Sequence, residues 1–155
     1  MSLLTGRIVC ITGSSRGIGR GCAVECAKHG AAGLALHYLG DPVTEQEAHS
    51  LKQEIENAYP KTRVIVVSGD IAESSTSTKV GVHLKLVRIN LTRVEYLKIV
   101  EASVKTFGRI DVLVSNAGIC PFAEFLTMPH ATWERTRQVN LDGSFYITQG
   151  VSFMN

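Results

Sequence analysis

The amino-acid sequence predicts an α/β fold in which helices cover both faces of a parallel sheet. Four short apolar runs, rich in β-branched residues, have the length and composition of buried strands, and they occupy 7–11, 33–38, 63–68 and 110–114. Segments whose apolar residues recur at helical spacing separate the first three runs. Because parallel strands need crossover connections, and these are almost always right-handed, the alternation favours βαβ units.

Local start and stop signals delimit the two helices expected in the first half of the chain. The first follows a glycine-rich turn and ends before Gly30, a residue typical of helix ends. Its apolar positions recur every four residues, which predicts one inward face made of Ile18, Cys22 and Cys26. The second begins at Asp41 and Pro42, an N-cap followed by a residue suited to the first turn, and it ends before Pro60.

The composition is that of a globular domain and argues against several classes of function. The chain has 155 residues, of which 45% are hydrophobic and 19% are charged, enough for one domain with a core. A net charge of +2 is too small to indicate nucleic acid or a membrane surface as a partner, and no apolar run has transmembrane length. The sequence shows no secretory signal, and its four cysteines follow no disulfide or metal-binding pattern. We therefore expect a cytoplasmic protein that holds no metal.

A glycine-rich turn over 12–19 joins the first expected strand to the first expected helix. Its glycines, at 13, 17 and 19, follow the spacing G-x-x-x-G-x-G, one residue longer than the commoner dinucleotide-binding spacing G-x-G-x-x-G. Such a turn lets the backbone come close to a phosphate and directs the free N–H groups of the following helix toward it. Taken alone, the pattern leaves open whether these glycines bind phosphate or only form a turn.

The end of the second expected strand bears on the choice between NAD and NADP. In a dinucleotide-binding fold, an acid at this place bonds the 2′-hydroxyl of the adenine ribose. Here the strand ends in His37-Tyr38-Leu39, and the next acid is Asp41. A 2′-phosphate would meet no repelling carboxylate and would find a cation in Arg16 of the glycine-rich turn. The pattern favours NADP over NAD, and the alternative is that Arg16 is only a solvated surface charge.

Four short motifs occur in the order typical of one enzyme family. They are Thr12-Gly13-x-x-x-Gly17-Ile18-Gly19, Asp70-Ile71, Asn116-Ala117-Gly118 and Val139-Asn140. Through these motifs, nearly the whole chain resembles the short-chain dehydrogenase/reductase family. The resemblance implies a Rossmann-type, doubly wound parallel sheet that binds NAD(P). It also implies an oxidoreductase that interconverts alcohols and carbonyls by hydride transfer, with a small-molecule alcohol or carbonyl as the substrate of a complete form.

The resemblance also assigns roles to particular residues. It implies that 13–19 holds the pyrophosphate of the cofactor, that Asp70 and Ile71 border the adenine, and that 116–118 lines a ribose and the central sheet. Asn140 would be the helix asparagine of the family's catalytic tetrad, which holds a water molecule in the proton relay. The residues expected to contact the dinucleotide are Gly13, Ser15, Arg16, Gly17, Ile18, Gly19, Tyr38, Asp70, Ile71, Asn116, Ala117 and Gly118.

The sequence departs from the family after Asn140. The family carries a serine and then a Tyr-x-x-x-Lys pair there, in which the tyrosine is the general acid/base and the lysine lowers its pKa. Tyr146 has Gly150 four residues on, and no such pair follows Asn140. We therefore expect a single incomplete domain, 1–155, truncated after the fourth strand and the following helix and unable to turn over a carbonyl substrate alone. The alternatives are a non-catalytic dinucleotide-binding module and a pairing partner of a full-length subunit.

A second departure lies between the third and fourth expected strands. Asp70 and Asn116 are 46 positions apart, whereas a loop, a helix and a loop of ordinary length take about 25 to 30. The surplus fits an atypical inserted segment at 80–98, which alternates like strands inside what otherwise reads as one helix. We hypothesise that this segment is translated intron, because valine codons begin with GT and one lysine codon is AAG. The alternative is a genuine surface insertion, and sequencing of the mature transcript across codons 79–99 distinguishes the two.

An apolar stripe runs along the helix expected from His130 onward. Val139, Ile147 and Val151 recur at helical spacing, with Gly143 among them, which suits close packing. In the family this helix contributes to a dimer interface. The resemblance therefore implies a homo-oligomer formed through the 130–154 helix.

Overall fold

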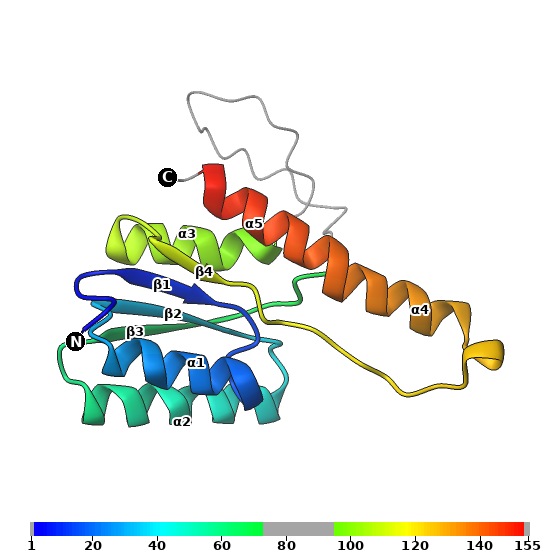
Figure 1. Ribbon diagram of the computed structural model, residues 1–155, viewed down its shortest axis with the longest axis horizontal. Helices are drawn as coiled ribbons and strands as arrows, with labels where there is room; N and C mark the ends of the chain where they lie inside the picture. Colours follow the sequence, from blue (N-terminus) through cyan, green and yellow to red (C-terminus); the bar gives the residue numbers. More distant parts are fainter. Residues whose placement is uncertain (1, 73–94, 154–155) are drawn as a thin grey trace.

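The computed structural model describes residues 2–72 and 95–153 (Figure 1). The first half of the chain contains β1 (Ile8–Ile11), α1 (Gly17–Lys28), β2 (Gly33–Tyr38), α2 (Pro42–Ala58) and β3 (Arg63–Ser68). The second half contains α3 (Glu95–Phe107), β4 (Val112–Val114), the short 3₁₀-helix η1 (Phe125–Thr127), α4 (His130–Arg137), the π-helical η2 (Gln138–Gly143) and α5 (Ser144–Phe153).

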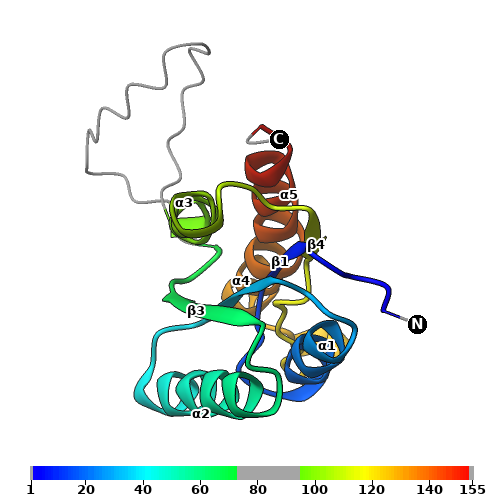
Figure 2. The same cartoon turned by 90° about the vertical axis from the view of Figure 1, so that its left-hand side faces the viewer.

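The four strands form one parallel sheet, so the predicted α/β fold is confirmed. The strand order is β3-β2-β1-β4, and Cys10 of β1 lies opposite Ala35 of β2 and Leu113 of β4. The helices α1 and α2 lie on one face of the sheet, and α3 and α5 lie on the other, as Figures 1 and 2 show. Because all four strands are parallel, the loops that follow them gather at one edge of the sheet.

The alternation of side chains along β1 builds a core on each face of the sheet. Val9 and Ile11 are buried among residues of α1 and α2, whereas Cys10, between them, is buried among residues of α3 and α5. Burial raises the pKa of the Cys10 thiol to about 12, so the thiol stays protonated and behaves as a small apolar group. Both faces of the strand are thus fixed by packing.

Small residues bring α1 close to the sheet. The prediction that Ile18 faces inward together with the two cysteines of this helix is wrong, because the Ile18 side chain is 79% exposed. Cys22 and Cys26 are half-buried against the core. The fully buried positions of the helix are Gly19, Ala23 and Ala27. Without large side chains on its buried face, the helix backbone approaches the strands, and its first turn lies against their carboxyl ends.

The helix expected from His130 onward is interrupted by a π-helical segment. The residues 130–153 are helical throughout, but η2 separates α4 from α5. The predicted stripe is buried: Val139, Gly143, Ile147 and Val151 face the protein interior. A Cβ at Gly143 would lie 2.8 Å from Cδ1 of Ile71, so the glycine allows the helix to pack tightly on the loop after β3.

Most of the predicted insertion lies outside the described residues. The structure describes the chain up to Ala72 and again from Glu95, so 80–94 and the alternation in it stay a prediction. The last residues of the segment, 95–98, form the start of α3, and the helical continuation predicted from Ile99 onward is confirmed as far as Phe107. Within 2–72 and 95–153, no helix combines the length and the apolar character needed to cross a bilayer.

The carboxylate of Asp111 ties the start of β4 to the start of β1. It accepts a hydrogen bond from the Ile8 N–H (2.7 Å) and ion-pairs with Arg109 (3.0 Å) and Arg7 (3.4 Å). The hydrogen bond from the Ile8 backbone is the main cause that holds the pKa of Asp111 below its ordinary value, and Arg109 and Arg7 add to it. The charged form of Asp111 therefore stabilises the folded protein.

The variant Asp111→Asn is expected to lower the free energy of unfolding by about 1.5 kcal/mol near pH 7, the low end of what hydrogen bonds to a charged group contribute, because both arginine partners are exposed. The folded-state pKa lies below the unfolded one, so the contribution is present above the ordinary carboxyl pKa and is lost as the pH falls through the folded-state value. Urea unfolding of both proteins near pH 7 and near pH 3 measures the effect. A variant that is equally destabilised at both pH values would contradict this account.

Candidate functional site

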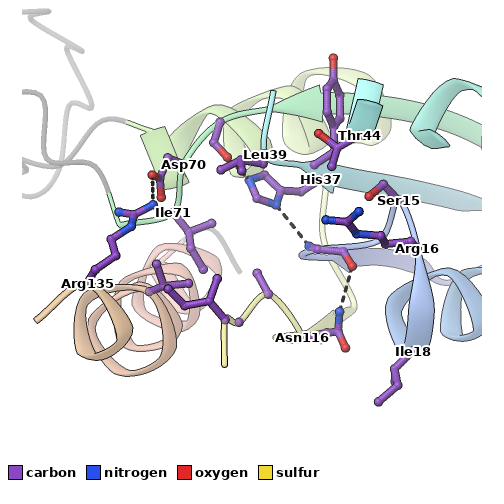
Figure 3. Close-up of a pocket in the computed structure, with 17 residues that line it drawn as sticks. Ser15, Arg16, Ile18, His37, Leu39, Thr44, Asp70, Ile71, Asn116 and Arg135 are labelled. Atoms are coloured by element: carbon purple, nitrogen blue, oxygen red, sulfur yellow. Dashed lines mark hydrogen bonds and ion pairs between the residues drawn. The ribbon is translucent and has the colours of Figure 1, made fainter. Parts of the chain in front are cut away.

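A cleft of about 360 Å³ opens at the carboxyl ends of the strands (Figure 3). The loops after all four strands contribute to it, and α4 and η2 form part of its wall. Of the residues predicted to contact a dinucleotide, those that line the cleft are Gly13, Ser15, Arg16, Ile18, Tyr38, Asp70, Ile71, Asn116, Ala117 and Gly118. Gly17, Gly19 and Asn140 lie outside this lining. The lining also includes residues that sequence reasoning missed as site residues, among them His37, Thr44 and Arg135.

Glycine is required at the three positions of the turn after β1 for different structural reasons. Gly13 and Gly17 have φ angles of +62° and +57°, a backbone conformation that favours glycine. A Cβ at Gly13 would also lie 2.8 Å from Cα of Ala117. Gly19 has an ordinary φ, but a Cβ there would lie 2.6 Å from Nδ2 of Asn116. Gly13 and Gly19 are therefore needed for close packing, and Gly17 for the turn itself.

Thr12 and Asn116 join the turn after β1 to the loop after β4. The buried Thr12 hydroxyl accepts hydrogen bonds from the backbone N–H groups of Asn116 and Ala117, both at 3.0 Å. In return, Nδ2 of Asn116 donates to the carbonyl oxygens of Thr12 (3.1 Å) and Gly13 (2.9 Å). We call these four hydrogen bonds the Thr12–Asn116 clamp; it sets the glycine-rich turn and the β4 loop at a fixed separation.

His37, near the end of β2, bridges the turn after β1 and the loop after β3. Its Nδ1 accepts a hydrogen bond from the Gly13 N–H (3.3 Å), and its Nε2 lies 2.7 Å from the Gly69 carbonyl oxygen. An N–H can only donate and a carbonyl can only accept, so these two bonds require the neutral ring with its proton on Nε2. The only signal for this role in the sequence is a polar residue at the end of an apolar strand.

The amino-terminal end of α1 faces the cleft and is suited to an anion. Arg16 is the N-cap residue, its side chain makes no capping hydrogen bond, and the first turn contains no acid. The first N–H groups of a helix lack partners within the helix, and the dipole adds positive potential there. The Arg16 guanidinium adds a full charge; its side chain is 68% exposed and lies 3.9 Å from the Glu47 carboxylate. A phosphate group therefore fits this end of the cleft.

Asp70, in the loop after β3, is already engaged in the structure. Its carboxylate accepts a hydrogen bond from the Ala72 N–H (2.9 Å) and forms an ion pair with Arg135 of α4, which Figure 3 shows across the cleft from Arg16. Arg135 thus anchors α4 to the end of β3. No local pattern in the sequence indicates this pair, because 65 positions separate its members.

Asn140 lies in η2, and its side chain makes a pair of hydrogen bonds with the backbone of Ile119 in the loop after β4. Its Oδ1 accepts a hydrogen bond from the Ile119 N–H and its Nδ2 donates to the Ile119 carbonyl oxygen, both at 2.8 Å. The residue is exposed and does not line the cleft. Its side chain fixes the loop after β4 against the helix, and π-helical segments of this kind are frequent at functional sites.

Metal ligands do not gather in this part of the protein. Across 2–72 and 95–153, no three histidine, cysteine, aspartate or glutamate side chains lie close enough together to hold a metal ion. The polar groups that line the cleft are backbone N–H groups, Arg16, the Arg135–Asp70 ion pair and neutral side chains such as His37 and Asn116.

Known proteins share both the sequence pattern and the fold. The sequence model of the family described as "short chain dehydrogenase" matches residues 7–85 and 76–154. The chain is 39% identical to an L-rhamnose 1-dehydrogenase (NAD(P)(+)) of Sphingomonas sp. (strain SKA58), over 98% of this chain and 50% of that protein. It is 30% identical to an L-rhamnose 1-dehydrogenase (NADP(+)) of Thermoplasma acidophilum, over 95% of this chain and 48% of that protein. The chain therefore spans about half the length of the curated relatives it matches.

Solved structures agree on the fold. The L-sorbose reductase of Gluconobacter frateurii, solved with NADPH and L-sorbose, superposes with a TM-score of 0.78 at 22% identity, over 99% of this chain and 49% of that one. A Burkholderia cenocepacia structure solved with bound NADP gives a TM-score of 0.76 at 18% identity, over 96% of this chain and 48% of that one. The family match covers almost the whole sequence, its motifs gather at one cleft, and the sheet has the Rossmann order. The chain belongs to the short-chain dehydrogenase family.

Proposed function

We propose that the cleft binds NADP in preference to NAD. The observation that carries this proposal is the uncapped end of α1 with Arg16 beside it, in a cleft whose β2 wall offers no free carboxylate. The β2 end contributes Tyr38 and Leu39 to the cleft. The nearby Asp41 carboxylate is engaged as the N-cap of α2. It accepts hydrogen bonds from the N–H groups of Val43 (3.1 Å) and Thr44 (3.0 Å). A 2′-phosphate there would meet the Arg16 cation, and no free carboxylate at the β2 end would repel it.

The same proposal gives each part of the cleft a task. The backbone of 13–19 would hold the pyrophosphate, Ile71 would border the adenine with Asp70, and 116–118 would line a ribose. Because Asp70 is held by Arg135 and Ala72, its role toward the adenine is that of a fixed wall. The bound cofactor would supply the hydride acceptor or donor, and Asn140 would act by holding the loop at Ile119 in place.

For the substrate of a complete form, we propose an aldose sugar that is oxidised at its C1 hydroxyl. Several relatives at 30% identity or more are named L-rhamnose 1-dehydrogenases, and they differ in their named cofactor, which is NAD(P)(+) in some and NADP(+) in another. In such a reaction the C1 hydrogen leaves as hydride to the nicotinamide and the hydroxyl proton is released. L-Rhamnose is therefore the first sugar to test.

The 155-residue chain is expected to bind the cofactor without turning over substrate, because no Tyr-x-x-x-Lys pair follows Asn140. The assay follows NADPH at its absorbance band, with L-rhamnose and NADP⁺ in one direction and a panel of ketones and NADPH in the other. A curated relative such as the Sphingomonas enzyme is the positive control. Turnover by the purified chain at ordinary enzyme rates would refute this expectation and with it the non-catalytic binding module, which is the second function we consider.

Arg16→Gln is expected to weaken NADPH binding by about ten-fold or more, because a charge-assisted hydrogen bond to phosphate contributes about 1.5 to 3 kcal/mol. NADH lacks the 2′-phosphate, so its affinity should change little. Calorimetric titration of the wild-type chain and the variant with both cofactors measures this. Lys28→Gln removes a charge at the opposite end of α1 and serves as the control. An equal loss of affinity for NADH and NADPH would show that Arg16 does not read the 2′-phosphate.

We further propose that α4, η2 and α5 form the contact with a second copy of the chain. Large apolar side chains on this helical run are exposed, namely Trp133, Leu141, Phe145 and Phe153. A face of this kind is typical of an interface between proteins.

Phe145→Glu is expected to shift the chain from dimer toward monomer and to raise the dissociation constant by about ten-fold or more, since a buried charge opposes association. Light scattering coupled to gel filtration over a range of concentrations measures the mass. Phe122→Glu, which places the same charge at a 99% exposed side chain outside this helical run, is the control. A wild-type chain that is monomeric at every concentration would rule out the proposed contact.

A further inference from the structure

Glu47 of α2 presents its carboxylate to Arg16 in an incomplete contact. Its Oε1 lies 3.9 Å from Nη1 of Arg16, which is at the long end of ion-pair distances. Its other oxygen, Oε2, is buried and has no hydrogen-bond partner among the described residues. Arg20 lies nearby but donates to the backbone carbonyl of Glu47 (3.3 Å) and pairs with the carboxylate of Glu54. The Glu47 carboxylate thus has one loose partner and one oxygen without a donor.

This geometry leaves Arg16 weakly held. An exposed ion pair at long distance contributes little, and the Arg16 side chain is 68% exposed, so its guanidinium can turn toward a stronger acceptor. A phosphate dianion is such an acceptor, because it offers more charge and several oxygens to the guanidinium. A buried carboxylate oxygen without a hydrogen-bond donor is energetically unfavourable. This oxygen belongs to the side chain beside Arg16, which is the only cation on this side of the described cleft, so a functional role for the contact is worth testing.

The other acids near the cleft are already engaged. Asp41 caps α2, and Asp70 is bound to Arg135 and to the Ala72 N–H. Among the described residues, Glu47 is therefore the carboxylate that pairs with Arg16 and that a bound phosphate would have to displace.

We propose that Glu47 competes with the 2′-phosphate of NADP for Arg16 and thereby sets how strongly the cleft prefers NADP over NAD. The inference rests on the proposed cofactor function of the cleft. When Arg16 turns to a 2′-phosphate, the Glu47 carboxylate loses its only ion-pair partner in the described structure, and it also repels the phosphate. When the ribose carries a 2′-hydroxyl instead, the Arg16–Glu47 pair persists and no cation is left unpaired. Glu47 thus lowers the affinity for NADP and leaves that for NAD unchanged.

The test uses two adenosine fragments that differ only in the 2′-phosphate, namely adenosine 2′,5′-bisphosphate and 5′-AMP, titrated calorimetrically into the whole chain. Glu47→Gln keeps the shape of the side chain and removes its charge. It is expected to tighten binding of the bisphosphate by about two- to five-fold, the range that an exposed ion pair corresponds to, and to leave 5′-AMP unchanged. In an Arg16→Gln background, the same change should alter the ratio of the two affinities less, because only the direct repulsion between Glu47 and the phosphate is left to remove.

Glu54→Gln is the matched control, because it removes the same charge from the same helix but breaks an ion pair with Arg20 instead of Arg16. It should leave both affinities unchanged, and thermal melting verifies that each variant is folded. If Glu47→Gln leaves the bisphosphate affinity unchanged or weakens it while Arg16→Gln still weakens it, the competition is refuted and the proposed NADP function stands. If neither fragment nor NADPH binds the wild-type chain, the proposed function fails, and this inference fails with it.

Discussion

The functional end of this molecule depends on the Thr12–Asn116 clamp. Thr12 is completely buried, and its hydroxyl accepts two backbone N–H groups of the β4 loop, while the Asn116 amide donates to two carbonyls of the glycine-rich turn. Loss of either side chain would leave partly buried backbone groups of the two loops without these partners, which is unfavourable. Because the clamp fixes the separation of these two loops, Gly13 and Gly19 must be glycines, and the cleft between the loops keeps its width.

Three further polar side chains hold the loops after β1, β3 and β4 in a similar way. His37 joins the β1 turn to the β3 loop, Arg135 joins α4 to Asp70, and Asn140 joins η2 to the β4 loop. The packed sheet supplies the position of these loops, and the hydrogen bonds between them supply the shape of the cleft. Within the described residues, the first turn of α1 has no side-chain cap, and its N–H groups face the cleft together with Arg16, whose ion pair with Glu47 is long (3.9 Å). Most polar side chains around the cleft thus hold the loops in place, whereas the positive first turn of α1 is accessible to an anion.

The sequence predicted the scaffold well because its signals are local. Apolar runs marked the four strands, Asp41 and Pro42 marked the start of α2, and four motifs placed most of the cleft lining at the strand ends. It failed where the reason is a contact between distant residues. Ile18 follows the apolar spacing of α1, yet tight packing of Gly19 on Asn116 rotates it into the cleft mouth, and the Arg135–Asp70 pair has no local pattern. The contact between Glu47 and Arg16 also joins distant residues, so no local pattern predicts it. The insertion at 80–98 stays a prediction.

The central claim is that the cleft at the strand ends is a dinucleotide site with a preference for the 2′-phosphate. The most direct test is calorimetric titration of the wild-type chain with NADPH and with NADH under the same conditions. The account predicts one site for each cofactor and a tighter dissociation constant for NADPH, by about ten-fold, as expected for one added charge-assisted contact. Binding of NADH that is equal to or stronger than that of NADPH would contradict the part played by Arg16. Failure of both cofactors to bind would contradict the assignment of the cleft itself.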